Sequence, residues 1–386
     1  NVEEREFVRC ASRLNVEEDE IVRCVRRGAT PLIQIGRSSM PAGALRETIQ
    51  AAPEQLASGR QAIREMHDRG LEGTQVCGRL TSLIDDVVIR VFDGALAGLP
   101  DKTADLLRAR VALVGLGSYG RRQSAPYSDV DLMILHDAGS RDPITELVRP
   151  FTQALYDVGL ELGYSVRTVK DAINLARTDP IICTSQIGGR LVAGNQRVYD
   201  RFRDDFTKLL QKRARSLSQA FHDARAEERR KYGETVYLLE PNVKRSRGAL
   251  RDLHLLQWLG YVEFGESDLD RLHLMGAMSK FEHRRLPTAR TFLLRVRNEI
   301  HFHAGLANET LSRGEQLRLA EVFGHRHRAG LLPVEHFMRD YFRHTNHLWQ
   351  MVRRREASLV ASSAVTRMLD PVLGKSVAGD FRIGLK

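Results

Sequence analysis

The sequence lacks several features by which whole classes of protein are recognised. It contains no run of 18 uncharged apolar residues, so no membrane span is expected, and its first residues hold no apolar core of a secretory signal. Only 4 of its 386 residues are cysteine, and none forms a Cys-x-x-Cys pair or has zinc-like spacing. These absences argue against a membrane, secreted or zinc-binding protein and predict a reduced, cytoplasmic location.

Aromatic residues are scarce, at 6%, and they are not interleaved with the basic residues. The net charge of +10 and the pI of about 9.6 predict an anionic partner, which a nucleotide, a nucleic acid or an acidic protein would satisfy. The arginines are scattered through helical patterns, and no RNA-binding module is recognisable. A nucleic acid is therefore the least expected of the three partners.

What the sequence does have is a turn followed by paired acids over residues 117–131, which read GSYGRRQSAPYSDVD. Side chains alternate along a strand, so Asp129 and Asp131 are expected on the same face. Two carboxylates about 4 Å apart repel by about 4 kcal/mol at an effective dielectric constant near 20. A divalent cation relieves that repulsion, and hard oxygen ligands suit Mg²⁺, which completes its shell with substrate phosphates.

The Gly117-Ser118 turn permits close backbone approach and presents N–H groups to phosphates. An alternative is a plain hairpin with two solvated acids. Apolar runs at 111–116 and 132–135 flank the pattern, and this combination favours a nucleotidyl-transfer site with two metal ions. The pattern resembles the DNA polymerase β-like nucleotidyltransferase superfamily.

Hydrophobic periodicity predicts a small sheet with flanking helices, followed by helices alone. Residues 1–28 hold a near-duplication with a period of 14, and 29–43 resemble a loop. Residues 44–94 show a helical pattern, and Pro143 is expected to begin another helix. Strands are expected at 110–116, 129–136 and 164–169. After residue 171 only helices are expected, near 184–193, 196–232, 249–264, 284–303, 314–323 and 333–355.

The expected fold is therefore an α+β nucleotidyltransferase domain, with a small mixed sheet and flanking helices, followed by an all-helical domain. The predicted divisions are an N-terminal extension at 1–43, the nucleotidyltransferase domain at 44–200, the helical domain at 201–355 and a linker at 356–386.

A second unusual segment, residues 239–253, reads LEPNVKRSRGALRDL between two helical patterns. Gly248 would allow close backbone approach, and Arg251 stands at a helix start, where a basic residue is not favoured. One interpretation is an interhelical loop with a local Arg251–Asp252 pair, worth less than about 1 kcal/mol if exposed. The other is a functional loop, and the residue chemistry leaves both open.

This segment resembles the Glu-Pro-Asn-x-Lys…Gly-x-Leu-Arg-Asp signature of the bacterial PII uridylyltransferase/uridylyl-removing enzymes. Residues 117–131 resemble the same family, and similar stretches follow in the same order at 165–168, 190–194, 294–302 and 336–343. The resemblance implies transfer of UMP from UTP to a tyrosine of a PII-type nitrogen regulatory protein, with release of pyrophosphate. It also implies metal binding by Asp129 and Asp131 and nucleotide binding by Gly117, Ser118, Arg121, Arg167, Asn242, Lys244, Arg251 and Asp252.

The chain also departs from the family pattern. Arg247 and Ala249 stand where the family has Pro and Gly, and Ser118 replaces a common Gly. The third carboxylate of the superfamily is expected near residues 164–167, where no acid occurs. Asp157, Glu161, Asp171 and Asp179 are the neighbouring candidates, and Asp179 is preferred because it lies in a segment that matches the family. The family continues into an HD phosphohydrolase domain and two ACT domains, so a fragment or a shortened paralogue is expected.

Two other functions stay open on the sequence. One is a nucleotidyltransferase that acts on RNA or a small metabolite, which the high pI allows. The other is a degenerate domain that binds nucleotide or a PII-type protein as a regulator, which the missing third acid allows.

Overall fold

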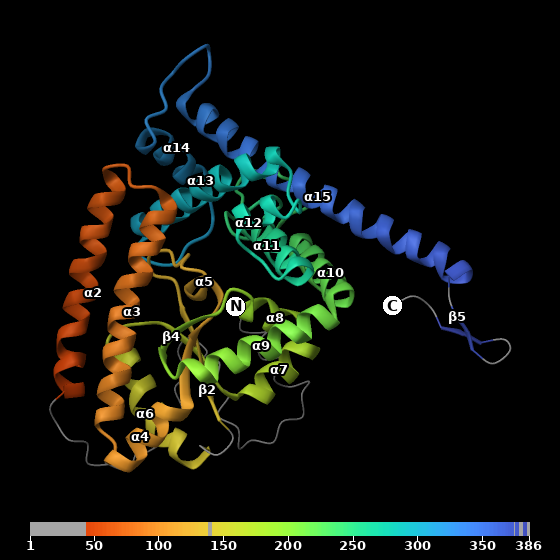
Figure 1. Ribbon diagram of the computed structural model, residues 1–386. Helices are drawn as coiled ribbons and strands as arrows, with labels where there is room; N and C mark the ends of the chain where they lie inside the picture. The colour runs from red at the N-terminus through yellow and green to blue at the C-terminus, as the bar shows by residue number, and fades with distance from the viewer. Residues whose placement is uncertain (1–43, 138–140, 374, 378–380, 384–386) are drawn as a thin grey trace. The chain divides into compact units, whose positions relative to one another are not determined.

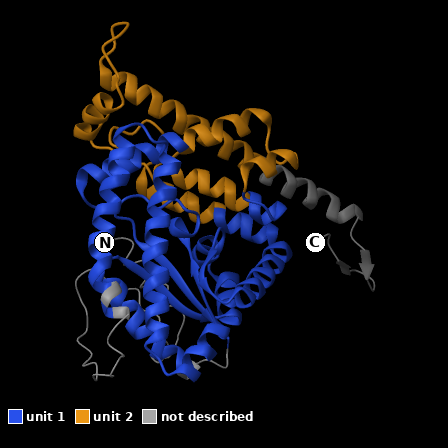
Figure 2. Cartoon of the chain, turned by 60° about the vertical axis from the view of Figure 1, so that its left-hand side comes forward, with its two compact units in different colours: residues 1–221, 260–267, 291–309 blue, residues 222–259, 268–290, 310–386 orange. Residues whose placement is uncertain are grey.

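The computed structural model describes residues 44–137, 141–373, 375–377 and 381–383. The predicted duplication at 1–28 and the loop at 29–43 lie outside them. The chain forms two compact units (Figure 2). Unit 1 takes the chain up to Phe221 together with Gly260–Ser267 and Thr291–Glu309, and unit 2 takes the remainder. Residue 200 lies inside unit 1, and the predicted division into domains stays a prediction.

Unit 1 is built on a four-stranded mixed sheet in the order β3-β2-β1-β4. β1 pairs antiparallel with β2 and β4, whereas β2 and β3 are parallel. The register of the parallel pair sets Asp131 beside Gly163. The strand bounds are Val111–Gly115 for β1, Val130–His136 for β2, Leu162–Thr168 for β3 and Arg190–Gly194 for β4.

Helices supply the rest of unit 1 (Figure 1). They are α2 (Ala44–Asp68), α3 (Gly73–Ala97), α4 (Asp101–Arg110), α5 (Gly117–Gly120), α6 (Arg141–Asp157), α7 (Val169–Thr178), α8 (Pro180–Gln186) and α9 (Gln196–Lys212). Three helices pass from one unit to the other along the chain, namely α10 (Ala214–Tyr232), α11 (Leu250–Phe264) and α13 (Lys280–Ala304).

In the described residues of unit 2, the regular elements are helices and one short hairpin. Besides its parts of α10, α11 and α13 it contains α12 (Leu269–Leu274), α14 (Arg313–Val322), α15 (Pro333–Leu373), β5 (Lys375–Val377) and β6 (Phe381–Ile383). Among the residues that the structure describes, no helix is both long and apolar enough to cross a membrane.

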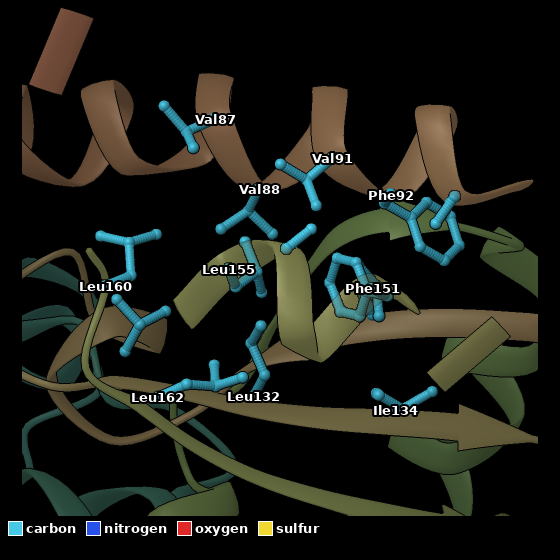
Figure 3. Close-up of a cluster of buried hydrophobic side chains, with 14 of the residues drawn as sticks. Val87, Val88, Val91, Phe92, Leu132, Ile134, Phe151, Leu155, Leu160 and Leu162 are labelled. Atoms are coloured by element: carbon cyan, nitrogen blue, oxygen red, sulfur yellow. The ribbon is translucent and has the colours of Figure 1, made fainter. Parts of the chain in front are cut away.

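The core of unit 1 fills the space between one face of the sheet, α3 and α6. Figure 3 shows Val88 and Val91 of α3 pointing toward α6, whose Leu155 lies above Leu132 of β2. Burying a side chain of this size stabilises a fold by about 1.5–3 kcal/mol relative to exposure. The residues of β2 that alternate with this core, Asp131 among them, therefore face the opposite side of the sheet.

The predicted fold class is confirmed, but three element predictions were wrong. The helix predicted at 184–193 ends at Gln186, and β4 follows at Arg190–Gly194 because it pairs with the edge of β1. The helical pattern at 44–94 is two helices separated at Gly70, whose φ of +94° ends the first. The helix predicted at 196–232 is interrupted at Arg213.

Candidate active site

The turn after β1 and the start of β2 bring the first predicted site residues together. Gly117 begins α5 with a φ of +55°, a conformation that glycine adopts without steric cost. The backbone N–H of Leu116 donates to the carbonyl of Asp131 at 2.9 Å, which joins the turn to β2. Gly117 and Ser118 therefore start a short helix beside Asp131, as the strand–turn–strand pattern predicts.

The Asp131 carboxylate lies between two glycines. A Cβ atom on Gly117 would clash with its Oδ2, and a Cβ atom on Gly163 of β3 would come within 2.8 Å of its Oδ1. Any larger residue at either position would therefore push against the carboxylate. We call Gly117, Gly163 and the Asp131 carboxylate the glycine cradle, and its shape keeps side-chain bulk away from both carboxylate oxygens.

Asp129 stands just before β2 and is exposed, whereas Asp131 is half-buried and Val130 between them belongs to the core. This alternation agrees with the expectation that both acids share one face. Two carboxylates on one face are hard oxygen ligands of the kind that Mg²⁺ takes. Within the described part of the chain, no group of three or more His, Cys, Asp or Glu side chains is arranged to hold a metal ion.

The structure does not supply a third carboxylate from β3, which reads LGYSVRT. Asp179 caps α8 by accepting the backbone N–H groups of Ile181 and Ile182 at 2.7 and 3.1 Å. Asp171 lies in the first turn of α7, where it accepts the Thr168 hydroxyl at 2.6 Å. Asp179 thus caps a helix, Asp171 contacts the Thr168 residue that caps α7, and the third carboxylate stays unassigned.

Arg121 lies close to the turn at Gly117, whereas Arg167 lies further along β3. The Arg121 side chain follows the turn, where its Nε lies 3.5 Å from Gln123 Oε1 and its stem packs on Gly188. Arg167 is paired with Leu135, four residues along β3 from Gly163. At about 3.3 Å per residue this separation is roughly 13 Å along the strand, so the backbone of Arg167 is remote from the glycine cradle.

Asp85 of α3 is a residue that the sequence did not single out. Its carboxylate accepts the Tyr119 hydroxyl at 2.6 Å, Arg190 Nη2 at 2.5 Å and Arg122 Nη1 at 3.2 Å. Arg190 also lies over the Tyr119 ring, 4.9 Å from its centroid. Burial, followed by the nearby Asp85 charge, raises the pKa of Tyr119 far above its ordinary value, which keeps the phenol neutral. In the sequence, only its place beside the apolar stripe of α3 could have drawn attention to Asp85.

The second motif, residues 239–253, lies in unit 2 and is held by its own side chains. Asn242 Oδ1 accepts the backbone N–H groups of Lys244 and Arg245 at 3.1 and 2.8 Å. Gly248 has a φ of +75°, and a Cβ atom there would clash with the carbonyl of Thr345 in α15. The predicted close backbone approach at Gly248 is therefore confirmed.

Asp252 does not form the predicted pair with Arg251. It is completely buried and accepts Arg225 Nε at 2.7 Å, Arg229 Nη1 at 3.3 Å and the backbone N–H of Gly248 at 2.6 Å. Arg251 instead has its Nε 3.6 Å from Glu228 Oε1. Consecutive residues of a helix point in directions about 100° apart, so Arg251 and Asp252 reach different neighbours.

Comparison with known proteins agrees with the resemblance seen in the sequence. Residues 57–167, which include all three residues of the glycine cradle, match the model of the DUF294 nucleotidyltransferase family. Residues 217–354 match the model described as GlnD PII-uridylyltransferase.

Relatives named bifunctional uridylyltransferase/uridylyl-removing enzyme match the chain at similar levels. The protein of Ectopseudomonas mendocina is 36% identical over 239 residues, 61% of this chain and 26% of the relative. That of Stutzerimonas stutzeri is 33% identical over 304 residues, 78% and 31%. That of Bradyrhizobium diazoefficiens is 32% identical over 294 residues, 76% and 32%. The chain thus spans roughly a quarter to a third of the length of these relatives.

Proposed function

We propose that this chain, similar in sequence to the uridylyltransferases, transfers UMP from UTP to a tyrosine hydroxyl of a PII-type nitrogen regulatory protein and releases pyrophosphate. The observation that carries the proposal is the glycine cradle around Asp131, which lies within the residues that match a nucleotidyltransferase model. The PII-uridylyltransferase match over residues 217–354 and the names of the relatives support the substrate and the partner. A cytoplasmic location, where UTP is made, is part of the same proposal.

Two magnesium ions are the proposed cofactors, with Asp129 and Asp131 as their protein ligands. The donor set fits, because both side chains are carboxylates and the glycine cradle keeps bulk away from Asp131. When bound, such ions stabilise the charge on the entering and leaving oxygens of a phosphoryl displacement.

The chain's own residues are proposed to bind and orient the reactants. Gly117 and Ser118 admit the triphosphate close to the backbone, and Arg121 offsets part of its charge. The Asp85 network fixes Tyr119 and thereby the α5 turn. The acceptor tyrosine oxygen attacks the α-phosphorus in line, its proton passes to solvent or a neighbouring base, and pyrophosphate leaves.

The loop of unit 2 is proposed to contribute to nucleotide binding through Asn242, Lys244, Arg251 and Asp252. Lys244 and Arg251 supply positive charge on a half-buried surface. Asn242 and Asp252 shape the loop through backbone N–H groups, which supports an indirect contribution from these two. Arg167 is retained as a candidate for phosphate charge, at the far end of β3.

The test is transfer of label from α-labelled UTP by the purified chain with Mg²⁺ and three acceptors: a PII-type protein, the same protein with its acceptor tyrosine changed to Phe, and RNA. Label on the unmodified PII-type protein alone is the expected result. Label on RNA would favour the RNA nucleotidyltransferase instead. Pyrophosphate release no greater than that of an Asp129→Asn/Asp131→Asn double variant would identify a degenerate binding domain. Repeating the assay with ATP, CTP and GTP measures the base preference.

A further inference from the structure

The part of α13 that belongs to unit 1 holds the loop immediately before the paired acids. Arg297 is buried, and its guanidinium contacts both carboxylate oxygens of Glu309, at 2.6 Å from Nη2 and at 2.8 and 3.0 Å from Nε. Its Nη2 also lies 3.3 Å from the Oγ atom of Ser128, and Ser128 is the residue before Asp129. The buried Arg297 therefore connects the Glu309 carboxylate to Ser128, the neighbour of the proposed metal ligand Asp129.

His301 lies one helical turn further along α13 and holds the same loop at a second point. Its ring is fully buried, and its Nδ1 hydrogen-bonds the carbonyl of Pro126. Its Nε2 lies 3.6 Å from Glu309 Oε1, so both α13 side chains face the same carboxylate. We call Arg297 and His301 the α13 clamp.

The residue between the two contact points has an unusual backbone. Tyr127 has a φ of +60°, in the left-handed region that a side chain with a Cβ atom rarely adopts. Such a conformation is strained and persists only where the surroundings determine it. The α13 clamp contacts residues 126 and 128 on either side of Tyr127, and Arg60 of α2 lies over its ring at 5.3 Å.

The positive charge of Arg297 also interacts with Asp129, the residue that follows Ser128. Burial lowers the pKa of Arg297, but the Glu309 carboxylate and its hydrogen bonds, with smaller effects from Cys77 and Asp129, raise the pKa above the ordinary value. Arg297 is therefore a permanent cation near Asp129. Because Glu309 holds the guanidinium at two points, that cation is fixed in orientation.

We propose that the α13 clamp positions the Asp129 carboxylate for metal binding by holding residues 126–128 in this strained conformation. Arg297 and His301 are positioning residues in this scheme, since they act through Ser128 and Pro126. The inference rests on the proposed function, because it assumes that Asp129 is a metal ligand. It assigns a role to Arg297 and His301, which lie in the stretch 294–302 that resembles the family and had no function assigned.

The experiment measures Mn²⁺ binding to the full chain in the presence of UTP, from the loss of the free-Mn²⁺ electron paramagnetic resonance signal. Ser128→Ala removes one contact of the clamp without leaving a buried charge unpaired. We expect about tenfold weaker Mn²⁺ binding with little change in thermal stability, since partners outside the ligand shell typically contribute 10–100-fold to metal affinity. Ser128→Thr keeps the hydroxyl and should retain the wild-type affinity.

Two further variants sharpen the result. Ser185→Ala removes a half-buried hydroxyl of α8, which donates to the carbonyl of Ile182, and should bind Mn²⁺ as the wild type does. Arg297→Lys should weaken Mn²⁺ binding, because one ammonium group cannot replace the fork that spans Glu309 and Ser128.

The outcomes separate this inference from the proposed function. One outcome is that Asp131→Asn abolishes Mn²⁺ binding while Ser128→Ala binds Mn²⁺ as tightly as the wild type. The positioning role of the α13 clamp is then contradicted, and the metal site at Asp131 is supported. If the wild type shows no Mn²⁺ binding that depends on Asp131, the proposed site and the clamp both fail. Weaker binding in Ser128→Ala, with wild-type binding in Ser128→Thr and Ser185→Ala, supports the clamp.

Discussion

The paired acids of unit 1 and residues 239–253 of unit 2 match the same kind of enzyme by sequence, yet their acidic residues lie in different surroundings. Asp131 in unit 1 is half-buried between two glycines, and Asp129 is exposed. Asp252 in unit 2 is completely buried and saturated by two arginines and a backbone N–H. Acids of two recognisable motifs can thus differ in burial, and the completely buried Asp252 holds the fold of its loop.

The sharpest division between the two acids comes from replacing each. Asp131→Asn should reduce transfer about 1000-fold, because the loss of a metal ligand removes several kcal/mol of transition-state stabilisation. Its thermal stability should equal or exceed that of the wild type, since one of two neighbouring negative charges is removed. Initial rates and thermal melts measure both effects.

Asp137→Asn is the matched control for Asp131→Asn. Asp137 follows the other end of β2 and pairs with Arg201 at 2.9 Å. Near-normal transfer by this variant and near-total loss in Asp131→Asn is the expected pattern. Normal turnover by Asp131→Asn would mean that Asp131 is not a metal ligand in the reaction.

Asp252→Ala should act on stability first. It leaves the buried guanidinium groups of Arg225 and Arg229 without their shared carboxylate, which typically costs about 3–5 kcal/mol. The chain's two tryptophans, Trp258 and Trp349, both lie in unit 2, so the denaturant midpoint of tryptophan fluorescence reports this unit. A variant that kept its midpoint but raised the KM for UTP would show that Asp252 serves the nucleotide directly.

Gly163→Ala tests the glycine cradle by a single methyl group. The added Cβ would lie 2.8 Å from Asp131 Oδ1, so the carboxylate must shift, and we expect the Mg²⁺ concentration for half-maximal activity to rise about tenfold. Gly117 is a poorer choice, because its φ of +55° would add backbone strain to the same change.

Gly78→Ala provides the comparison for the cradle variant. Nothing lies within 4 Å of a Cβ at Gly78 in α3, and alanine is favoured over glycine in a helix by about 1 kcal/mol. This variant should be slightly more stable with an unchanged Mg²⁺ requirement. An equal Mg²⁺ requirement in Gly163→Ala and Gly78→Ala would show that the glycine cradle does not affect metal binding.

The smallest expected effect is a pH dependence of unit 2. Burial, assisted by Arg343 and opposed by Asp340, lowers the pKa of His344 to about 4, whereas an unfolded histidine titrates near 6.5. Between these values the unfolded state binds more protons, so stability is present above about pH 6.5 and falls as the pH drops toward 4. His222, His325 and His347 have lowered pKa values of the same sign and also lie in unit 2.

The denaturant midpoint reported by tryptophan fluorescence should therefore decrease when the pH is lowered from 7.5 to 5.5. His344→Gln should make that decrease smaller. This interval lies above the ordinary titration range of carboxylates, which isolates the histidine contribution. The same slope in His344→Gln and the wild type would show that other groups govern the acid response.

The sequence predicted the parts of the fold that depend on short-range pattern. The strands at β1 and β2 and the apolar stripe of α6 follow from periodicity, and the Gly117-to-Asp131 pattern located the paired acids. β4 was missed because its half-buried residues acquire their strand conformation from pairing with β1, a contact that local pattern does not contain.

The supporting residues were missed for a related reason. Asp85 and Arg297 are separated from the residues that they hold by 34 and 169 positions along the chain. Only a folded arrangement shows that a buried arginine of α13 reaches Ser128. The Arg251–Asp252 pair was wrong because adjacency along a helix does not place two side chains on one face.

The buried thiol of Cys77 gives the unit that lacks tryptophan a reporter of its own. Cys77 lies in α3, its Sγ is 3.5 Å from Asn298 Oδ1 of α13, and burial raises its pKa to about 11. Almost no thiolate exists at neutral pH, and the sulfur is covered while the two helices stay packed. Its alkylation rate, followed by peptide mass spectrometry, would therefore record how often the α3–α13 junction separates. Metal and nucleotide that stabilise the neighbouring loop should slow that chemistry without touching the cysteine.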